Sequence, residues 1–98
     1  MMARKKKRIA LVGCGGISHI HVEGFNLVKD KAEVVAVCDI DAKNAKLRGE
    51  QAGGATVYSD WKELLAKEDI DAVDICLPHH LHKPAILDFA KAKKHIIC

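Results

Sequence analysis

The sequence predicts an α/β fold in which helices cover both faces of a doubly wound parallel sheet. Short apolar runs alternate with segments of helical periodicity from residue 8 to the last residue, which is the pattern of repeated strand-helix units. The chain has 98 residues, of which 49% are hydrophobic, enough for the core of one domain. Right-handed crossovers place the helices on both faces of the sheet, and the expected strand order is 3-2-1-4-5.

Five short segments are the expected strands. They span residues 8–13, 33–39, 55–58, 70–77 and 95–98. The run from Val34 to Cys38 is continuously apolar, which is typical of a parallel strand buried on both faces.

The first two helices are expected to pack through apolar or small residues at helical spacing. The first begins at about Ile17, and its expected buried face consists of Ile17, Ile20, Gly24, Leu27 and Val28. The second repeats this pattern at Ala42, Ala45, Gly49 and Ala52. Asp41 is its expected N-terminal cap, and Gly53 and Gly54 end it.

The last two helices carry start signals of different kinds. The sequence Asp60-Trp-Lys-Glu63 is a variant of the capping box, and we expect Trp61, Leu64 and Leu65 in the core, with Trp61 as a core residue rather than a ligand contact. The last helix begins at about Lys83, with Pro84 in its first turn, where no N–H is needed. It should pack through Ala85, Ile86, Phe89 and Ala90.

The junction between the first strand and the first helix has the composition of an anion-binding loop. Gly13 can take the backbone angles of a tight turn, and Gly15 has no Cβ to hold a phosphate away from the backbone. The N–H groups at the start of the helix and the positive end of its dipole also favour an anion. The third small position of the motif is Ser18 rather than Gly or Ala. A glycine-rich turn without a ligand is the alternative interpretation of the motif alone.

Asp39 supports nucleotide binding, because it ends the second expected strand and lies 24 residues after Gly15 in the sequence. An acidic residue about 20 positions after such glycines accepts hydrogen bonds from the adenosine ribose hydroxyls. The alternative role for Asp39 is to cap the next helix, and we assign that role to Asp41 instead. A carboxylate at this place predicts NAD over NADP, because it would repel a 2′-phosphate, although Lys43 could partly offset the repulsion.

The second half of the site is expected in the segment from Leu77 to His82. In the expected strand order, the C-terminal ends of strands 1 and 4 form the ligand crevice together. His79 and His82 are interpreted as part of a wall of the nucleotide pocket, and solvated loop histidines are the alternative. Three imidazoles at positions i, i+1 and i+3 of a turn cannot easily face one ion, so we expect no metal site there.

Charge and composition exclude several classes of protein. The net charge is +3, and Arg4 to Arg8 supply five of the sixteen positive charges. We expect residues 1–7 to be a disordered basic tail rather than a nucleic-acid site, since no aromatic residues are interleaved with it. No apolar run is long enough to cross a membrane, and the run before Gly13 is too short for a signal segment. The expected location is therefore the cytoplasm.

The four cysteines do not form a recognisable framework. Cys14, Cys38, Cys76 and Cys98 show no C-x-x-C spacing, and each follows an apolar strand as a small hydrophobic residue would. We therefore expect neither a disulfide framework nor a cysteine-based zinc site.

Taken together, these residues resemble the glucose-fructose oxidoreductase and inositol dehydrogenase (Gfo/Idh/MocA) family of NAD(P)-dependent oxidoreductases. The resemblance covers nearly the whole chain. It rests on His82 and on the stretches Gly13 to His21, Val37 to Asp39, Tyr58 to Leu65, Asp71 to Pro78, and Lys94 to Ile97.

This resemblance implies that residues 1–98 form the Rossmann dinucleotide-binding domain of such an enzyme. Gly15, Gly16 and Ile17 would meet the pyrophosphate, Asp39 and Ile40 the adenosine, and Pro78, His79 and His82 the nicotinamide side. The complete set of expected cofactor contacts is Gly13, Gly15, Gly16, Ile17, Ser18, Asp39, Ile40, Leu77, Pro78, His79 and His82.

The chain departs from the family pattern at three points. His79 stands where the family often has Asn, Lys93 stands where a glycine usually ends the helix, and the sequence has no Glu-Lys-Pro motif or substrate-binding domain after Cys98. We therefore expect a truncated fragment, without catalytic residues of its own, that binds NAD but does not turn over. The implied parent enzyme would transfer a hydride between a nicotinamide cofactor and a sugar, polyol or related hydroxyl compound.

Two other functions remain open from the sequence. One is a non-catalytic nucleotide-sensing or interaction module. The other is a methyltransferase that binds S-adenosylmethionine, but such a protein would commonly carry an acidic residue just before the glycines, where Ile9 to Val12 supply none. The exposed fifth strand also favours self-association into a homo-oligomer.

Overall fold

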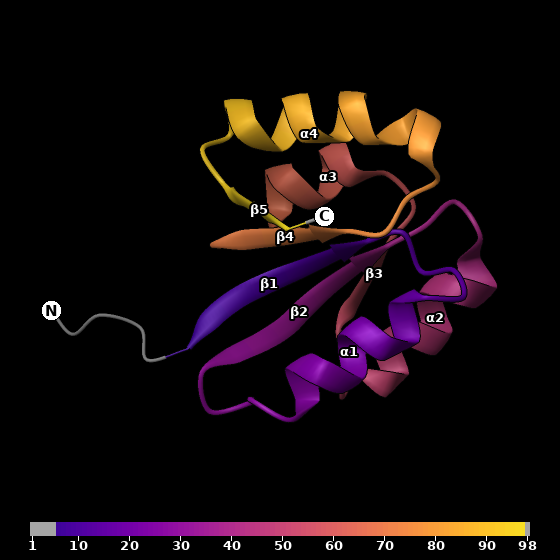
Figure 1. Cartoon of the computed structure of the whole chain (residues 1–98), viewed down its shortest axis with the longest axis vertical. Coiled ribbons are helices and arrows are strands. Elements are labelled where there is room, and N and C mark those ends of the chain that lie inside the picture. The colour runs from indigo at the N-terminus through magenta and orange to yellow at the C-terminus, as the bar shows by residue number, and fades with distance from the viewer. Residues whose placement is uncertain (1–5, 98) are drawn as a thin grey trace, which may run out of the picture.

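The computed structural model describes residues 6–97 and confirms the predicted fold class (Figure 1). One parallel sheet has the strand order β3-β2-β1-β4-β5, as expected. Its strands are β1 (Lys7–Val12), β2 (Ala32–Cys38), β3 (Thr56–Tyr58), β4 (Ala72–Ile75) and β5 (His95–Ile97). The helices are α1 (Ser18–Asn26), α2 (Ala42–Gln51), α3 (Trp61–Lys67), the short 3₁₀ helix η1 (His79–Leu81) and α4 (His82–Lys91).

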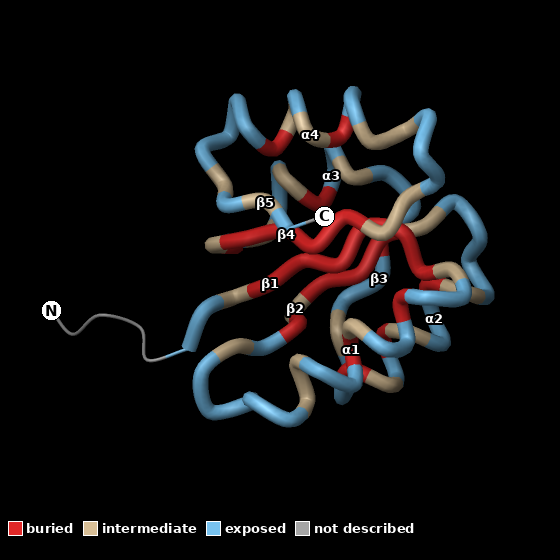
Figure 2. Tube along the Cα trace, viewed as in Figure 1, coloured by how far each residue is buried: buried red, intermediate tan, exposed pale blue. Residues whose placement is uncertain are grey.

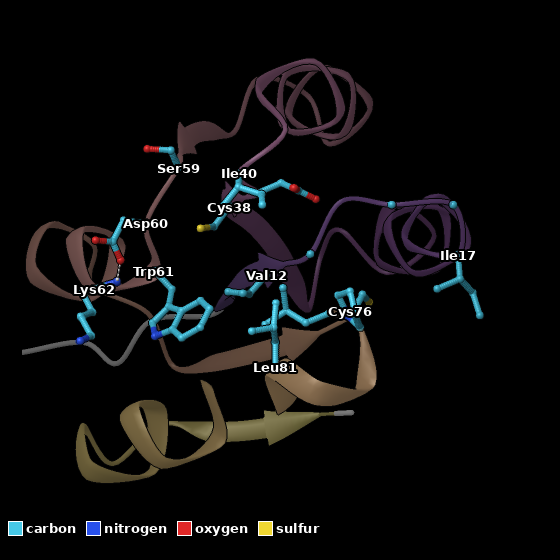
Figure 3. A pocket seen from close by; sticks show the side chains of 16 residues that line it. Val12, Ile17, Cys38, Ile40, Ser59, Asp60, Trp61, Lys62, Cys76 and Leu81 are labelled. Carbon is cyan, nitrogen blue, oxygen red and sulfur yellow. Dashed lines mark hydrogen bonds between the residues drawn. The ribbon is translucent and has the colours of Figure 1, made fainter. Parts of the chain in front are cut away.

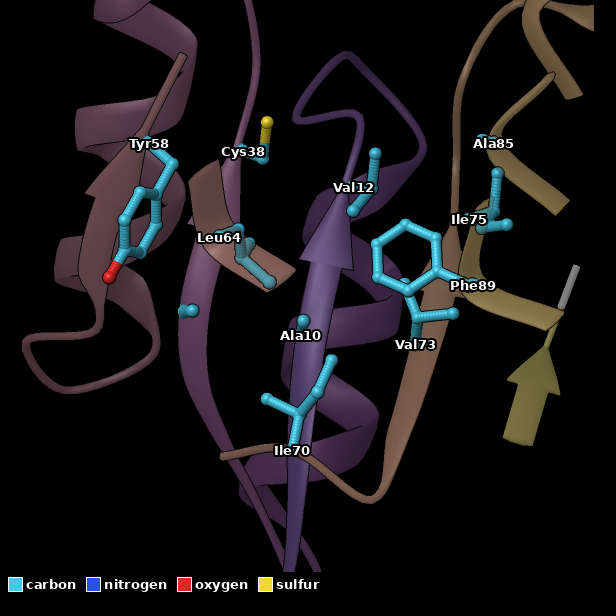
Figure 4. Packing of buried hydrophobic residues seen from close by; sticks show 11 residues of the cluster. Ala10, Val12, Cys38, Tyr58, Leu64, Ile70, Val73, Ile75, Ala85 and Phe89 are labelled. Carbon is cyan, nitrogen blue, oxygen red and sulfur yellow. The ribbon is translucent and has the colours of Figure 1, made fainter. Parts of the chain in front are cut away.

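The sheet separates two hydrophobic clusters. Alternate residues of β1 belong to opposite clusters, with Ala10 and Val12 on one face and Ile9 and Leu11 on the other, because successive strand side chains point to opposite faces. The first cluster lies under α3 and α4 and includes the fully buried Phe89 (Figure 4). The second lies under α1 and α2, so the central strands are buried on both sides (Figure 2).

A β-bulge interrupts the pairing of β1 with β2. Ile9 pairs with Val34, but the next residue, Ala10, pairs with Ala36. Val35 is the extra residue, and both it and Ala36 pack against the first cluster. The bulge therefore changes which face the later residues of β2 present and brings Cys38 beside Val12.

The first helix packs through a different face from the one predicted. Its buried residues are Ser18 and Val22, and Phe25 packs beside them in half-buried surroundings. The expected face is exposed instead, with Ile17 at 63% and Leu27 at 82% exposure. Both sets of residues have helical spacing, so the periodicity alone could not decide between them. Packing decides, because Val22 belongs to the second hydrophobic cluster and Phe25 packs against it.

Two helices end in the same hydrogen-bonded geometry with different residues. After α2, Gly53 has φ of +90°, its N–H donates to Glu50 O, and the next N–H donates to Gly49 O. After α4, Lys93 has φ of +60°, and the N–H groups of Lys93 and Lys94 donate to Ala90 O and Phe89 O. Both are Schellman motifs, whose left-handed position favours glycine. Lys93 therefore occupies a conformation that is unfavourable for a residue with a Cβ.

The ends of the chain differ slightly from expectation. The first residue of β1 is Lys7, which we had placed in the tail, and its N–H donates to Lys31 O at 2.9 Å. Lys6, also in the predicted tail, is described and exposed, whereas residues 1–5 and Cys98 lie outside the described residues. Within residues 6–97, no helix is both long and apolar enough to cross a membrane.

Candidate functional site

A cavity of about 770 Å³ opens at the C-terminal ends of β1, β2 and β4 (Figure 3). This is the edge of a doubly wound sheet where ligands bind, and the volume lies within the range of small-molecule sites. The lining residues are Val12, Gly13, Gly15, Gly16, Ile17, Cys38, Asp39, Ile40, Ser59, Asp60, Trp61, Lys62, Cys76, Leu77, Pro78 and Leu81.

Gly13 is required both by its backbone angle and by its neighbours. Its φ is +96°, in the region that side chains disfavour. A Cβ there would lie 2.6 Å from the carbonyl carbon of Cys76 and 2.7 Å from the nitrogen of Leu77. The turn after β1 thus passes directly against the backbone that follows β4, as the sequence predicted for the two halves of the site.

The cavity is also lined by three residues just before α1 whose backbone N–H groups are open: Gly15, Gly16 and Ile17. In the part of the chain that the structure describes, the N–H groups of Gly15, Gly16 and Ile17 donate no hydrogen bond to the protein. A Cβ on either glycine would meet nothing within 4 Å, and α1 begins at the next residue without a side-chain cap. Open N–H groups at a helix start form an anion site.

Ser18 supports this loop from beneath rather than lining the cavity. It is fully buried, and its hydroxyl donates to Gly15 O at 2.5 Å. The small side chain allows α1 to lie close to the sheet, as its place in the motif predicted. Its location makes it a positioning residue for the loop.

The two aspartates after β2 have the separate positions that the sequence predicted. Asp39 lines the cavity. Its Oδ2 accepts the Cys14 N–H at 2.7 Å, and its Oδ1 accepts the Asp41 N–H at 2.8 Å. The Asp41 carboxylate instead accepts the N–H groups of Lys43 and Asn44 at the start of α2, which confirms Asp41 as the cap.

The opposite wall contains only part of the predicted set. Leu77 and Pro78 line the cavity, whereas His79 and His82 do not. The ring of His82 is hydrogen-bonded through Nε2 to Leu77 O at 2.7 Å, and the ring centroids of His79 and His82 are 5.6 Å apart. His82 therefore holds the backbone of the wall, because the short η1 helix turns its side chain back toward that backbone.

The segment between β3 and α3 supplies lining residues that the sequence interpretation missed. Trp61 is half-buried, as expected of a core residue, but it also lines the cavity, and its Nε1 donates to Asp88 Oδ2 at 2.8 Å. Lys62 lines the cavity as well, whereas Lys43 does not. The rule that ligands bind beyond the carboxyl ends of strands could have identified this segment, because it directly follows β3.

The buried thiols near the cavity are poor nucleophiles. Burial, followed by the nearby negative charge of Asp39, raises the pKa of Cys14 and of Cys38 to about 12. Because the thiolate is the reactive form, these two thiols remain protonated and unreactive at neutral pH.

A family model described as "Oxidoreductase family, NAD-binding Rossmann fold" matches residues 7–98. The myo-inositol 2-dehydrogenase of Thermotoga maritima is 33% identical over 91 residues, which is 93% of this chain and 27% of that enzyme. This chain therefore spans about a quarter of the length of the curated relatives that it matches.

Two solved structures show the same fold at similar coverage. The WlbA dehydrogenase of Chromobacterium violaceum, in complex with NADH and UDP-GlcNAcA, superposes with a TM-score of 0.90 at 34% identity, over 97% of this chain and 27% of that chain. The scyllo-inositol dehydrogenase of Lactobacillus casei, with bound NAD(H) and scyllo-inositol, gives a TM-score of 0.85 at 26% identity, over 94% of this chain and 27% of that chain.

Proposed function

Because the chain belongs to the Gfo/Idh/MocA oxidoreductase family, we propose that it binds a nicotinamide dinucleotide for an enzyme that oxidises or reduces a sugar, polyol or related hydroxyl compound. One observation carries this proposal. The same cavity contains three backbone N–H groups that donate no hydrogen bond to the described part of the protein, in the loop from Gly15 to Ile17, and the carboxylate of Asp39, which hydrogen bonds hold in place. The N–H groups suit a pyrophosphate, and the carboxylate suits the hydroxyl groups of a ribose.

The pyrophosphate is assigned to the loop from Gly15 to Ile17. Gly13 makes the turn that places this loop at the start of α1, and the helix dipole adds a positive potential there. Neither glycine has a side chain to hold a phosphate oxygen away.

The adenosine is assigned to the cavity wall after β2 and β3. The carboxylate of Asp39 can accept ribose hydroxyl hydrogen bonds with the lone pairs that its two backbone donors leave unused. Ile40 is 90% exposed and lines this wall, so a flat base that packs on it would bury apolar area.

The nicotinamide is assigned to the wall formed by Leu77 and Pro78, which His79 and His82 support. His82 fixes the carbonyl of Leu77, and this contact orients the wall. When bound, the cofactor supplies the hydride chemistry, and the residues of this chain supply orientation and the exclusion of water.

We further propose NAD as the preferred cofactor. Asp39 places a negative charge where the 2′-phosphate of NADP would lie. Lys62 lines the same cavity, so it is the lysine that can reduce this repulsion. The substitution Lys62→Ala should therefore weaken NADP binding more than NAD binding and increase the preference for NAD.

The deciding experiment is calorimetric titration of the purified chain with NAD, NADP and S-adenosylmethionine in one buffer at one salt concentration. We expect saturable binding of NAD with a weaker response to NADP and none to S-adenosylmethionine. Preferential binding of S-adenosylmethionine would overturn the proposal in favour of a methyltransferase-like site. A folded chain that binds none of the three would also contradict it.

Catalysis is proposed to need residues beyond this chain, which spans 27% of its Thermotoga relative. Incubation of the chain with NAD and a panel of inositols and sugars should therefore give no NADH absorbance. Turnover with any of these compounds would show that the 98 residues are catalytically sufficient. Binding without turnover also suits a nucleotide sensor, and reconstitution of dehydrogenase activity on fusion to the substrate domain of a relative would favour the enzyme.

A further inference from the structure

We propose that His21, Asp74 and Cys76 form a binding site for a borderline divalent metal ion such as Zn²⁺, beside the dinucleotide cavity. One potential ligand atom from each residue lies within 4.8 Å of the others. The inference goes beyond cofactor binding, and it concerns residues that neither the glycine loop nor Asp39 uses.

The sheet brings these residues together from distant parts of the sequence. Asp74 lies in β4, and Cys76 is the residue directly after the strand, two positions from Asp74. Because side chains alternate along a strand, those of Asp74 and Cys76 point to the same face of the sheet. His21 reaches them from α1, which covers that face. The ligand atoms thus come from a parallel strand, from the residue directly after it, and from a helix on the same face of the sheet, and regular elements are rigid supports for a metal.

The donor set matches the chemistry of zinc. Imidazole nitrogen, carboxylate oxygen and thiolate sulfur are the three ligand types that Zn²⁺ binds, and three protein ligands leave a fourth position for water. An ionised Asp74 and Cys76 with a neutral His21 would carry two negative charges, which a divalent ion balances. Asp74 is only 1% exposed, and a carboxylate buried to this extent needs a partner that balances its charge or forms hydrogen bonds with it.

The three side chains contact one another at hydrogen-bond distances, from which a small rearrangement would give the spacing of a tetrahedral site. The Sγ atom of Cys76 lies 3.7 Å from Asp74 Oδ1, and the Nδ1 atom of His21 lies 2.6 Å from Asp74 Oδ2. Zinc bonds of about 2.0 to 2.3 Å separate neighbouring ligand atoms by about 3.3 to 3.5 Å. For a metal to enter, the separation of His21 Nδ1 and Asp74 Oδ2 must therefore increase by less than about 1 Å. A rotation of one of the two side chains can provide this change.

Binding would exchange protons for the metal. The thiol proton of Cys76 and the proton shared by His21 and Asp74 leave to solvent, and three bonds to the ion replace them. A metal ion can reach these residues from solvent, because the His21 side chain is 31% exposed and Cys76 lines the cavity proposed for the dinucleotide.

The sequence offered no sign of this cluster. His21 and Asp74 are 53 positions apart, and the cysteines show no zinc spacing. The histidines that suggested a metal, in the loop from His79 to His82, do not take part.

The test is a Co²⁺ titration of the chain under a phosphine reductant, followed by visible and near-ultraviolet absorption. We expect one equivalent to bind with the d–d bands of a tetrahedral ion and a thiolate-to-cobalt charge-transfer band, and one equivalent of Zn²⁺ to remove both. Cys76→Ser should abolish the charge-transfer band, and His21→Ala should weaken Co²⁺ binding at least tenfold. Cys38→Ser is the matched control and should leave the spectrum unchanged.

Several results would overturn the metal site. A charge-transfer band that survives in Cys76→Ser would place the ion on another thiol, and its loss in His80→Ala would place it in the histidine loop. A folded chain that shows no thiolate band at millimolar Co²⁺ would mean that the three residues are only a hydrogen-bonded core cluster. Because Asp74→Asn could prevent folding, the decision rests on the milder Cys76→Ser variant, with circular dichroism to verify its fold.

Discussion

The carboxylate of Asp39 and the backbone N–H of Cys14 are joined by a 2.7 Å hydrogen bond, which ties the end of β2 to the glycine turn. The other oxygen of the same carboxylate holds the Asp41 N–H at 2.8 Å. Asp39 therefore positions the loop proposed for the pyrophosphate and also presents the proposed ribose acceptor. Its two roles predict a large effect on binding.

Asp39→Asn should raise the dissociation constant for NAD by about 10- to 100-fold, since a hydrogen bond to a charged group is worth about 1.5 to 3 kcal/mol. The amide can accept only one of the two backbone N–H groups and also loses the negative charge. Calorimetry at constant salt measures the change. Asp41→Ala is the matched control, which should cost about 1 kcal/mol of stability through the lost cap but leave NAD affinity intact. Equal affinities in wild type and Asp39→Asn would remove the ribose assignment.

Gly13→Ala should destabilise the chain by at least about 2 kcal/mol, because the new Cβ meets both a positive φ and the Cys76 backbone. The measurement is the midpoint of urea unfolding. Gly24→Ala provides the comparison, since Gly24 lies within α1 with open space around its Cβ position. That substitution should instead stabilise by about 0.5 to 1 kcal/mol. A harmless Gly13→Ala would show that the turn can relax away from β4.

Lys93→Gly should stabilise the chain by about 1 kcal/mol, because Lys93 has φ of +60° in the Schellman motif after α4. The effect should appear as a higher urea midpoint with an unchanged slope. Lys91→Gly is the control, since the same substitution at the last residue of α4 should lower stability by about 0.5 to 1 kcal/mol. Destabilisation by both substitutions would contradict the left-handed conformation at Lys93.

Tyr58→Phe should change how stability depends on alkaline pH. The Tyr58 hydroxyl donates to Glu68 Oε2 at 2.5 Å, and this hydrogen bond, with burial, raises the pKa of Tyr58 from 10.0 to about 12. The folded state thus favours the neutral phenol. This contribution is complete below pH 10 and falls as the pH rises from 10 to about 12.

The phenylalanine variant should lose this alkaline decline, and it should cost about 1 kcal/mol at pH 8. Tyr58 is the only tyrosine of the chain, so phenolate absorbance follows its titration directly. If the phenolate absorbance of the folded protein had its titration midpoint near pH 10, the result would contradict the hydrogen bond to Glu68.

Local patterns predicted a large part of the fold. The alternation of strands and helices, the Asp41 cap and the turn at Gly13 depend on interactions within a few residues, which sequence spacing reports directly. The predicted strand order is also confirmed; it is a common order of doubly wound sheets, and the handedness of the crossovers alone does not select it. Of the residues expected to contact a cofactor, those that line the cavity are Gly13, Gly15, Gly16, Ile17, Asp39, Ile40, Leu77 and Pro78. Their contact with a cofactor stays a prediction.

Several features depended on contacts that local patterns do not specify. Two faces of α1 had helical spacing, and only the packing of α1 on the sheet shows that Val22 and Phe25 are the residues that face it. Trp61 and Lys62 reached the cavity because α3 begins at the same edge of the sheet as the glycine loop.

By itself, the sequence determined a parallel α/β fold with a glycine turn after the first strand and an acid after the second. These features follow from short-range sterics and from the two hydrophobic periodicities. Only the tertiary structure decided which side of α1 is buried, that Trp61 and Lys62 join the cavity wall, and that His21 meets Asp74 and Cys76. Such contacts between elements distant in sequence are set by how helices pack across the sheet, and no local spacing encodes that packing.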